Sequence, residues 1–172
     1  MRYGKIKYFD VANGSGVRTS LFVSGCRRNC PGCFSPETWD FNFGGDFTDE
    51  VEEKILDSME FKYIAGLSVL GGEPMESRRE LIPFLKKVKE KFPEKDIWIF
   101  TGYDWEEISL IVSVDGSMKE IMELVDVMKV GDFVQGLYEP GLQFRGSRNQ
   151  ELIDIRKSLE TGYKVLWEGS IK

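Results

Sequence analysis

The sequence predicts an α/β domain with a mostly parallel sheet. Short apolar runs rich in β-branched residues alternate with longer runs whose apolar residues recur at helical spacing. Three of the short runs end in small, polar turns: Gly25-Cys26, Gly71-Gly72 and Thr101-Gly102. Right-handed crossovers bring the carboxyl ends of parallel strands to one rim, where ligands bind in such folds. We therefore expect these three turns to meet.

The strands are predicted from apolar runs bounded by turn residues. The predicted central strands are Val17–Val23, Gly66–Leu70, Ile97–Phe100 and Val125–Val130. The stretches Met1–Tyr8 and Gly162–Trp167 would add edge strands. With 172 residues and no repeat or linker, residues 1–172 are expected to form a single domain.

Two helices are predicted from N-cap residues followed by an apolar stripe. Thr48 precedes a helix whose inward face carries Val51, Ile55 and Met59. Apolar residues at helical spacing mark the next helix: Leu81, Leu85, Val88 and Phe92. Its capping box would be Ser77 with Glu80. Pro83 lies inside this pattern, so we expect the helix to begin later or to bend.

Two further helix starts resemble capping boxes. Asp104 is followed three residues later by Glu107, and Ser117 by Glu120. Both follow the predicted strand Ile97–Phe100, so they belong to the connection that leads to the next strand.

Composition excludes several classes of function. The net charge is −6, which makes the chain a poor candidate for binding a nucleic acid backbone. No apolar run is long enough to span a bilayer, and residues 1–10 lack the apolar core of a signal peptide. We expect a cytoplasmic protein that binds neither nucleic acid nor membrane. The sequence has no His, which excludes Ser/His and Cys/His nucleophilic arrangements.

All three cysteines lie within eight residues, as Cys26-Arg-Arg-Asn-Cys30-Pro-Gly-Cys33, directly after a predicted strand. A disulfide framework is disfavoured because the count is odd. A zinc site would need Asp or Glu as its fourth ligand, and a redox pair of Cys30 and Cys33 would leave Cys26 unexplained. A [4Fe–4S] cluster held by three thiolates would keep one iron open for a chelating small molecule.

The C-x3-C-x2-C spacing resembles the cluster motif of the radical S-adenosylmethionine superfamily. The resemblance implies that Cys26, Cys30 and Cys33 bind a [4Fe–4S] cluster. It also implies that the open iron chelates S-adenosylmethionine, which an electron cleaves to methionine and a 5′-deoxyadenosyl radical. The superfamily usually has an aromatic residue before the third cysteine. Here Gly32 takes that place and Phe34 follows, so these two residues are expected to line the adenine side.

Two further loops are candidates for the same cofactor. Gly71-Gly72-Glu73 resembles the superfamily's G-G-E motif, whose backbone and carboxylate would receive the ammonium group of the methionine moiety. An ordinary strand-to-helix turn is the alternative. Thr101 ends the following strand, where its hydroxyl would reach ribose or simply cap the next helix. Adding a Cβ at Gly71 or Gly72 is expected to weaken cofactor binding more than folding.

Nearly the whole chain resembles one branch of the superfamily, the activating proteins of anaerobic ribonucleotide reductases. The supporting segments are Asn13–Arg18, Phe22–Cys26, Cys30–Cys33, Pro36–Asp40 and Phe144–Gln150. The resemblance implies a shortened, open (β/α) partial barrel. It also implies a large reductase partner, on which a glycyl radical is formed, and a small reductant such as flavodoxin or ferredoxin. Val130-Gly131 stands where other members have Asp-Gly.

Two other functions stay open from the sequence. One is activation of another glycyl-radical enzyme, such as the pyruvate formate-lyase type, whose activases are typically longer. The other is a zinc or electron-transfer module without enzymatic activity. Within the first hypothesis, Phe144–Gln150 is a candidate docking segment for the partner or a solvated turn, and Arg27 and Arg28 would hold an acidic electron donor or be solvated.

Overall fold

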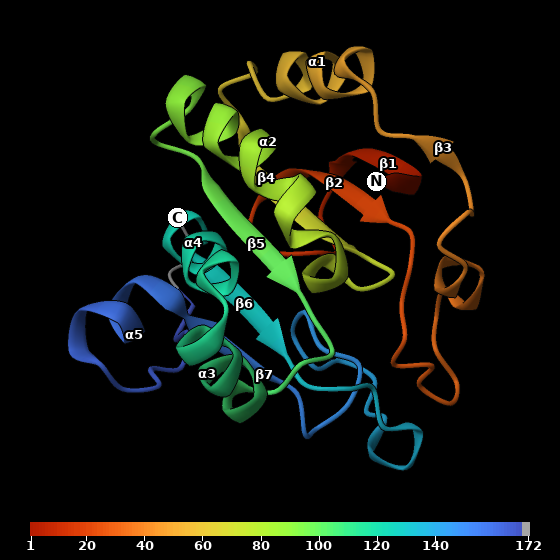
Figure 1. The fold of residues 1–172 in the computed structure, drawn as a ribbon, viewed down its shortest axis with the longest axis vertical. Helices are drawn as coiled ribbons and strands as arrows, with labels where there is room; N and C mark the ends of the chain where they lie inside the picture. The colour runs from red at the N-terminus through yellow and green to blue at the C-terminus, as the bar shows by residue number, and fades with distance from the viewer. Residues whose placement is uncertain (170–172) are drawn as a thin grey trace.

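The computed structural model describes residues 1–169, and within them the chain forms one sheet in the order β3-β1-β2-β4-β5-β6-β7. Figure 1 shows β4, β5 and β6 side by side. The strands are β1 (Arg2–Asp10), β2 (Val17–Val23), β3 (Gly45–Asp46), β4 (Ile64–Gly71), β5 (Asp96–Phe100), β6 (Val127–Val130) and β7 (Glu151–Asp154). The helices are α1 (Asp49–Ser58), α2 (Arg78–Lys91), α3 (Trp105–Val114), α4 (Gly116–Leu124) and α5 (Ile155–Thr161).

The middle of the sheet is parallel, as the alternation of strands and helices predicts. The pairs β2–β4, β4–β5 and β5–β6 are parallel, whereas β1 and β7 pair antiparallel with their neighbours. The sheet does not close on itself: its outer strands are β3 and β7. The α/β class and the open partial barrel are therefore confirmed, with antiparallel margins added to the parallel centre.

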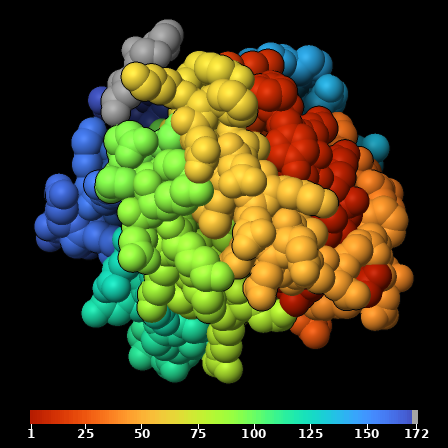
Figure 2. Space-filling model, turned by 90° about the horizontal axis from the view of Figure 1, so that it is seen from above, coloured from red at the N-terminus to blue at the C-terminus, as the bar shows by residue number. Residues whose placement is uncertain are grey.

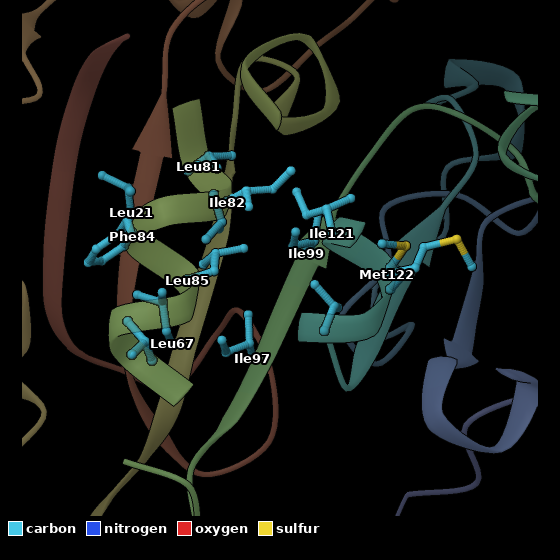
Figure 3. Packing of buried hydrophobic residues seen from close by; sticks show 14 of the residues in the cluster. Leu21, Leu67, Leu81, Ile82, Phe84, Leu85, Ile97, Ile99, Ile121 and Met122 are labelled. Carbon is cyan, nitrogen blue, oxygen red and sulfur yellow. The ribbon is translucent and has the colours of Figure 1, made fainter. Parts of the chain in front are cut away.

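The helices cover one face of this sheet. Because β2, β4, β5 and β6 are neighbours in chain order, crossovers of one hand place every connecting helix on the same side. One apolar cluster joins Ile55 of α1, Leu85 of α2 and Ile121 of α4 to strand residues such as Ile99. Figure 3 shows the side chains of α2 and α4 meeting those of β5. In Figure 2, α1 in gold and α2 in green lie side by side on the surface.

On the opposite face of the sheet, the described residues place aromatic side chains and no α-helix. The lower half of this face packs Trp98 against Phe144 and Trp167, with ring centroids 5.3 and 4.8 Å away. Arg18 is fully buried there, with its Nε 2.7 Å from Ser68 Oγ and its guanidinium over the Trp98 ring. The upper half of this face, toward the carboxyl ends of the parallel strands, is left to form a cavity.

Two predictions at the sheet margins are wrong. Gly162–Trp167 is not a strand; Gly162 ends α5 in the left-handed conformation, and only Leu166 bridges to Ile153. The outer strand on that side is β7, whose four residues are too few to show an alternation of apolar and polar residues in the sequence. The stretch Met1–Tyr8 does form a strand, but the two-residue β3 pairs outside it.

The helix starts are placed well, but three of the four predicted capping contacts differ. The capping box of Asp104 with Glu107 is present. Thr48 stands at the N-cap of α1 without a side-chain cap. Ser77 also caps nothing with its side chain, and there a 3-10 turn (Pro74–Ser77) leads directly into α2. Asp115 caps α4 in place of the predicted Ser117–Glu120 box. α2 begins at Arg78 and continues through Pro83, so the expectation of a later start is wrong; Pro83 lacks the N–H that would donate to the carbonyl of Arg79.

Candidate functional site

A cavity of about 620 Å³ opens at the carboxyl ends of the parallel strands, a size in the range of small-molecule sites, roughly 300–1,000 Å³. Loops after four strands line it. The residues after β2 are Cys26, Cys30, Cys33 and Phe34; those after β4, β5 and β6 are Gly72, Glu73, Thr101, Gly102, Gly131, Asp132 and Phe133. The three loops expected to meet do meet here, and the loop after β6 joins them.

The cysteine loop winds around the cavity wall in a tight path. Asn29 and Gly32 have positive φ values of 48° and 74°, which turn the chain sharply between the cysteines. The base of the loop is held to a neighbouring segment, because Gly25 N donates to Thr38 O at 2.8 Å. All three cysteines are free and partly buried.

The thiol donors fit an iron–sulfur cluster by their chemistry. Burial raises the pKa of Cys26 and of Cys30, whereas backbone N–H groups of Arg28 and Asn29 act in the opposite direction on Cys26. Ser35 N lies 3.5 Å from Cys33 Sγ. Such N–H groups stabilise thiolate, the ligand that iron–sulfur clusters take. Among residues 1–169, no three His, Cys, Asp or Glu side chains converge as they would around a single metal ion.

Arg28 fastens the cysteine loop to the rim opposite. Its Nη2 donates to Asp132 Oδ2 at 2.6 Å, its Nε donates to the other carboxylate oxygen, and its Nη1 reaches Glu107 Oε1 at 3.1 Å. The guanidinium also lies 4.8 Å from the Tyr103 ring centroid. Of the two alternatives that the sequence left open for Arg28, a freely solvated side chain is therefore wrong. Arg27 is mostly exposed and pairs with Glu76.

Replacing Arg28 with alanine should release the loop from the rim. Arg28 and Asp132 are partly exposed, so we expect a coupling energy of about 1 kcal/mol between them. The measurement is a double-mutant cycle with Arg28→Ala and Asp132→Ala, read as unfolding free energies of the cluster-free protein. The matched control is the Arg27–Glu76 pair, which should couple less because the Arg27 side chain is mostly exposed to solvent. A coupling near zero for Arg28 would contradict its role as a tether.

Glu73 lies inside the wall of the cavity rather than in its open space. It is buried, and its carboxylate accepts from Thr101 Oγ1 at 2.7 Å, Gly102 N at 2.7 Å and Met75 N at 3.0 Å. Burial raises its pKa, against the effect of these donors and of Lys129. The carboxylate thus ties the loop after β4 to the loop after β5. Thr101 is also buried, with its hydroxyl committed to Glu73 and to Tyr103 N.

Lys129 and Asp132 are cavity residues that sequence reasoning missed. Lys129 Nζ donates to the carbonyl oxygens of Thr101 and Gly131 at 3.2 and 3.3 Å. Burial lowers the pKa of Lys129 to about 8, while the charges of Glu73 and Cys30 act in the opposite direction. Asp132 follows β6, the fourth parallel strand, so its place at the carboxyl edge was the available signal.

The glycines of the G-G-E segment are required by the fold itself. Gly71 has a φ of +102°, and a Cβ there would lie 2.7 Å from Val23 O. A Cβ on Gly72 would lie 2.6 Å from Gly25 O and 2.9 Å from Thr38 O. Both contacts are with backbone that cannot move independently of the sheet.

Alanine at Gly72 should therefore destabilise the protein. Crowding of this kind costs about 1–3 kcal/mol. This expectation replaces the one drawn from the sequence, in which cofactor binding would suffer more than folding. Chemical denaturation of Gly72→Ala in the cluster-free protein measures the loss. Gly116→Ala is the control, because Gly116 begins α4 and a Cβ there would have no neighbour within 4 Å. Wild-type stability for Gly72→Ala would contradict the packing.

Phe34 and Gly32 occupy different surroundings. Phe34 is 71% exposed and lines the mouth of the cavity, with its ring centroid 5.0 Å from that of Phe133 and 6.1 Å from that of Tyr138. Gly32 is not among the lining residues; a Cβ there would meet the side chain of Gln135. The structure therefore brings Phe34 to the predicted cavity but places Gly32 behind its wall.

The segment Phe144–Gln150 is partly interior. Ser147 and Gln150 are buried, and Gln150 Nε2 donates to Gly131 O at 2.9 Å. Arg145 lines the cavity, and Arg148 lies outward, 3.6 Å from Glu139. The segment therefore builds one wall of the cavity, which excludes a simple solvated turn, and a docking role for it stays a prediction.

Comparison with known proteins gives consistent findings. Residues 12–153 match the family model described as a 4Fe-4S single cluster domain. The anaerobic ribonucleoside-triphosphate reductase-activating protein of Salmonella typhimurium is 36% identical over 91% of this chain and 100% of its own length. The proteins of the same name from Vibrio cholerae and Enterobacteria phage T4 are 38% and 37% identical, over 87% and 88% of this chain and 96% and 93% of theirs. No described helix is long and apolar enough to cross a membrane.

Proposed function

Since this chain belongs to the family of anaerobic ribonucleoside-triphosphate reductase-activating proteins, we propose that it activates its reductase by reductive cleavage of S-adenosylmethionine at a [4Fe–4S] cluster bound by Cys26, Cys30 and Cys33. The chain is an activating enzyme with an iron–sulfur domain. The proposal adds the cofactor, the ligands and the radical chemistry. The observation that carries it is the meeting of three free thiols with the Gly72–Glu73 and Thr101–Gly102 loops around one cavity.

The protein's own residues would prepare this site in three ways. The three thiols supply the ligands, and Arg28 holds their loop against the rim. Glu73 fixes the loops after β4 and β5, so that the backbone beside Gly72 is positioned to receive polar groups of a ligand. Phe34 and Phe133 offer apolar surface at the mouth. When bound, the cluster would supply an open iron for the methionine moiety and the electron that breaks the sulfonium bond.

The residues that the sequence assigned to S-adenosylmethionine would have different roles in this site. Gly71, Gly72 and Glu73 would present backbone and hold the wall, and Phe34 would contact the adenosyl group. Thr101 would act through its backbone, because its hydroxyl is committed to Glu73. Gly32 would serve the turn between Cys30 and Cys33.

The partner would be the large anaerobic reductase, whose glycine loses a hydrogen atom to the 5′-deoxyadenosyl radical. A flavodoxin or ferredoxin would supply the electron. The cavity is partly open to solvent, so a segment of the reductase would complete the enclosure that a reactive radical needs. The cytoplasmic location stays a prediction.

The test is an anaerobic reconstitution followed by three measurements. Metal analysis should give about four iron and four sulfide per chain. The reduced protein with S-adenosylmethionine should release 5′-deoxyadenosine, and adding the reductase should give a glycyl radical signal by paramagnetic resonance. Stoichiometric zinc without sulfide would overturn the proposal. A signal on a pyruvate formate-lyase type partner, with none on the reductase, would select the other activase class.

A further inference from the structure

Two lysines of β1 extend the cavity beyond the loops of the cofactor site. Lys5 and Lys7 are two residues apart, so both side chains point to the same face of the sheet. That face is the one without helices: Lys5 pairs across the sheet with Phe22, and both ammonium groups lie over the Phe22 ring, 4.6 and 5.5 Å from its centroid. Both lysines are exposed and line the cavity. They form its outer wall, on the side of the sheet opposite β7.

These lysines are not held in an ion pair by the described part of the chain, although the charge of Lys7 acts on Asp10 and helps to lower the pKa of that carboxyl. Among residues 1–169, neither makes an ion pair within 4.0 Å, although many other lysines and arginines of the chain do. The Phe22 ring contributes a weak attraction to both ammonium groups without supplying an opposite charge. The net charge of the whole chain is −6, so two neighbouring lysines without an ion pair at the mouth of this cavity are a local exception.

The charged residues that line the whole cavity also give it an excess of positive charge. Five cationic side chains line it against three carboxylates: Lys5, Lys7, Arg28, Lys129 and Arg145 against Glu73, Asp132 and Glu139. Each carboxylate is already engaged, Asp132 by Arg28, Glu139 by Arg148, and Glu73 by Thr101 and two backbone N–H groups. The described residues thus leave the cavity with an excess of positive charge that is greatest at its outer wall.

We propose that Lys5 and Lys7 form a docking site for a carboxylate-bearing segment of the reductase that enters the cavity. This inference rests on the proposed function and names the chemistry by which the partner is recognised. A polypeptide fits better than a small anion, because the two charges are spaced along a strand at an open mouth. The cysteine and Gly72–Glu73 loops lie on another wall of the same cavity. Opposite charges at the rim of an interface mainly accelerate and orient association.

The experiment compares two double variants with the same change of charge. Lys5→Glu with Lys7→Glu should weaken binding of the reconstituted protein to the reductase about tenfold. The control, Lys54→Glu with Lys62→Glu, changes exposed lysines away from the cavity and should shift the affinity less than about twofold. A chemical reductant replaces the electron-donor protein throughout, so that the glycyl radical yield reports on the reductase alone.

The outcomes separate this inference from the proposed function. Selective loss of reductase affinity, with the affinity for S-adenosylmethionine retained, supports the docking site. Unchanged reductase affinity overturns it, and so does a parallel fall in cofactor affinity, which would assign the lysines to the cofactor's carboxylate. A wild-type protein that forms no glycyl radical would instead overturn the proposed function. If the glutamate variant does not fold, Lys5→Gln with Lys7→Gln and the salt dependence of wild-type binding decide.

Discussion

Replacing any one of Cys26, Cys30 and Cys33 with alanine is expected to abolish release of 5′-deoxyadenosine. Two thiolates cannot hold a four-iron cluster in this cavity while leaving a single iron open. The backbone turns at Asn29 and Gly32 place each sulfur separately, so no cysteine can take the place of another. The measurement is iron and sulfide content together with product release after anaerobic reconstitution.

The same variants should fold normally without the cluster. The three thiols are partly exposed and form no disulfide, so each alanine is expected to change the unfolding free energy of the cluster-free protein by less than about 1 kcal/mol. This control separates loss of a ligand from loss of the fold. Wild-type product release from any of the three variants would refute the ligand assignment.

Replacing Glu73 with glutamine is expected to give the second largest loss, although the side chains have nearly the same shape. Three donors point at the two carboxylate oxygens: Thr101 Oγ1, Met75 N and Gly102 N. An amide has one oxygen, and its NH2 group would face at least one of these N–H donors in either orientation. A buried unsatisfied donor costs about 1–3 kcal/mol. We expect that loss in unfolding free energy, with cofactor affinity falling as the two loops separate.

The pH dependence of this variant provides an independent check. Burial raises the pKa of Glu73 above its usual value, so the folded protein binds a proton more readily there than the unfolded chain does. The stability that this group contributes is therefore greatest at low pH and is lost as pH rises from the ordinary pKa through the raised one. Glu73→Gln should lack this dependence. Glu90→Gln, an exposed change on α2, should retain it. Identical pH profiles for wild type and Glu73→Gln would contradict the burial argument.

The sequence predicted the central elements because their signals are local. Val17–Val23 and Ile97–Phe100 are short, β-rich and bounded by turn residues, and the structure contains both as strands. The strand β7 and the two-residue β3 carry too few residues for a periodic signal. Their pairing depends on which backbone groups are left free at the sheet margins, and that depends on the assembled sheet.

The roles of single residues at the rim of the cavity also depend on contacts that only the assembled fold creates. Nothing in the sequence indicated that Arg28 is tied down, because its partners Asp132 and Glu107 lie 104 and 79 residues away along the chain. The G-G-E resemblance predicted that the Glu73 carboxylate faces a ligand. In the structure, both of its oxygens accept from Thr101, Gly102 and Met75. Neither contact leaves a pattern in neighbouring residues.

The sequence by itself determined the α/β class, the cysteine spacing and the rim on which the chemistry-bearing loops would lie. These follow from local periodicity and from the handedness of crossovers, which neighbouring residues encode. Only the tertiary structure decided that Lys5 and Lys7 share a cavity with Cys26 and that Arg28 tethers the cysteine loop. It did so because those neighbours are set by strand order and sheet curvature, which bring together residues far apart in the chain.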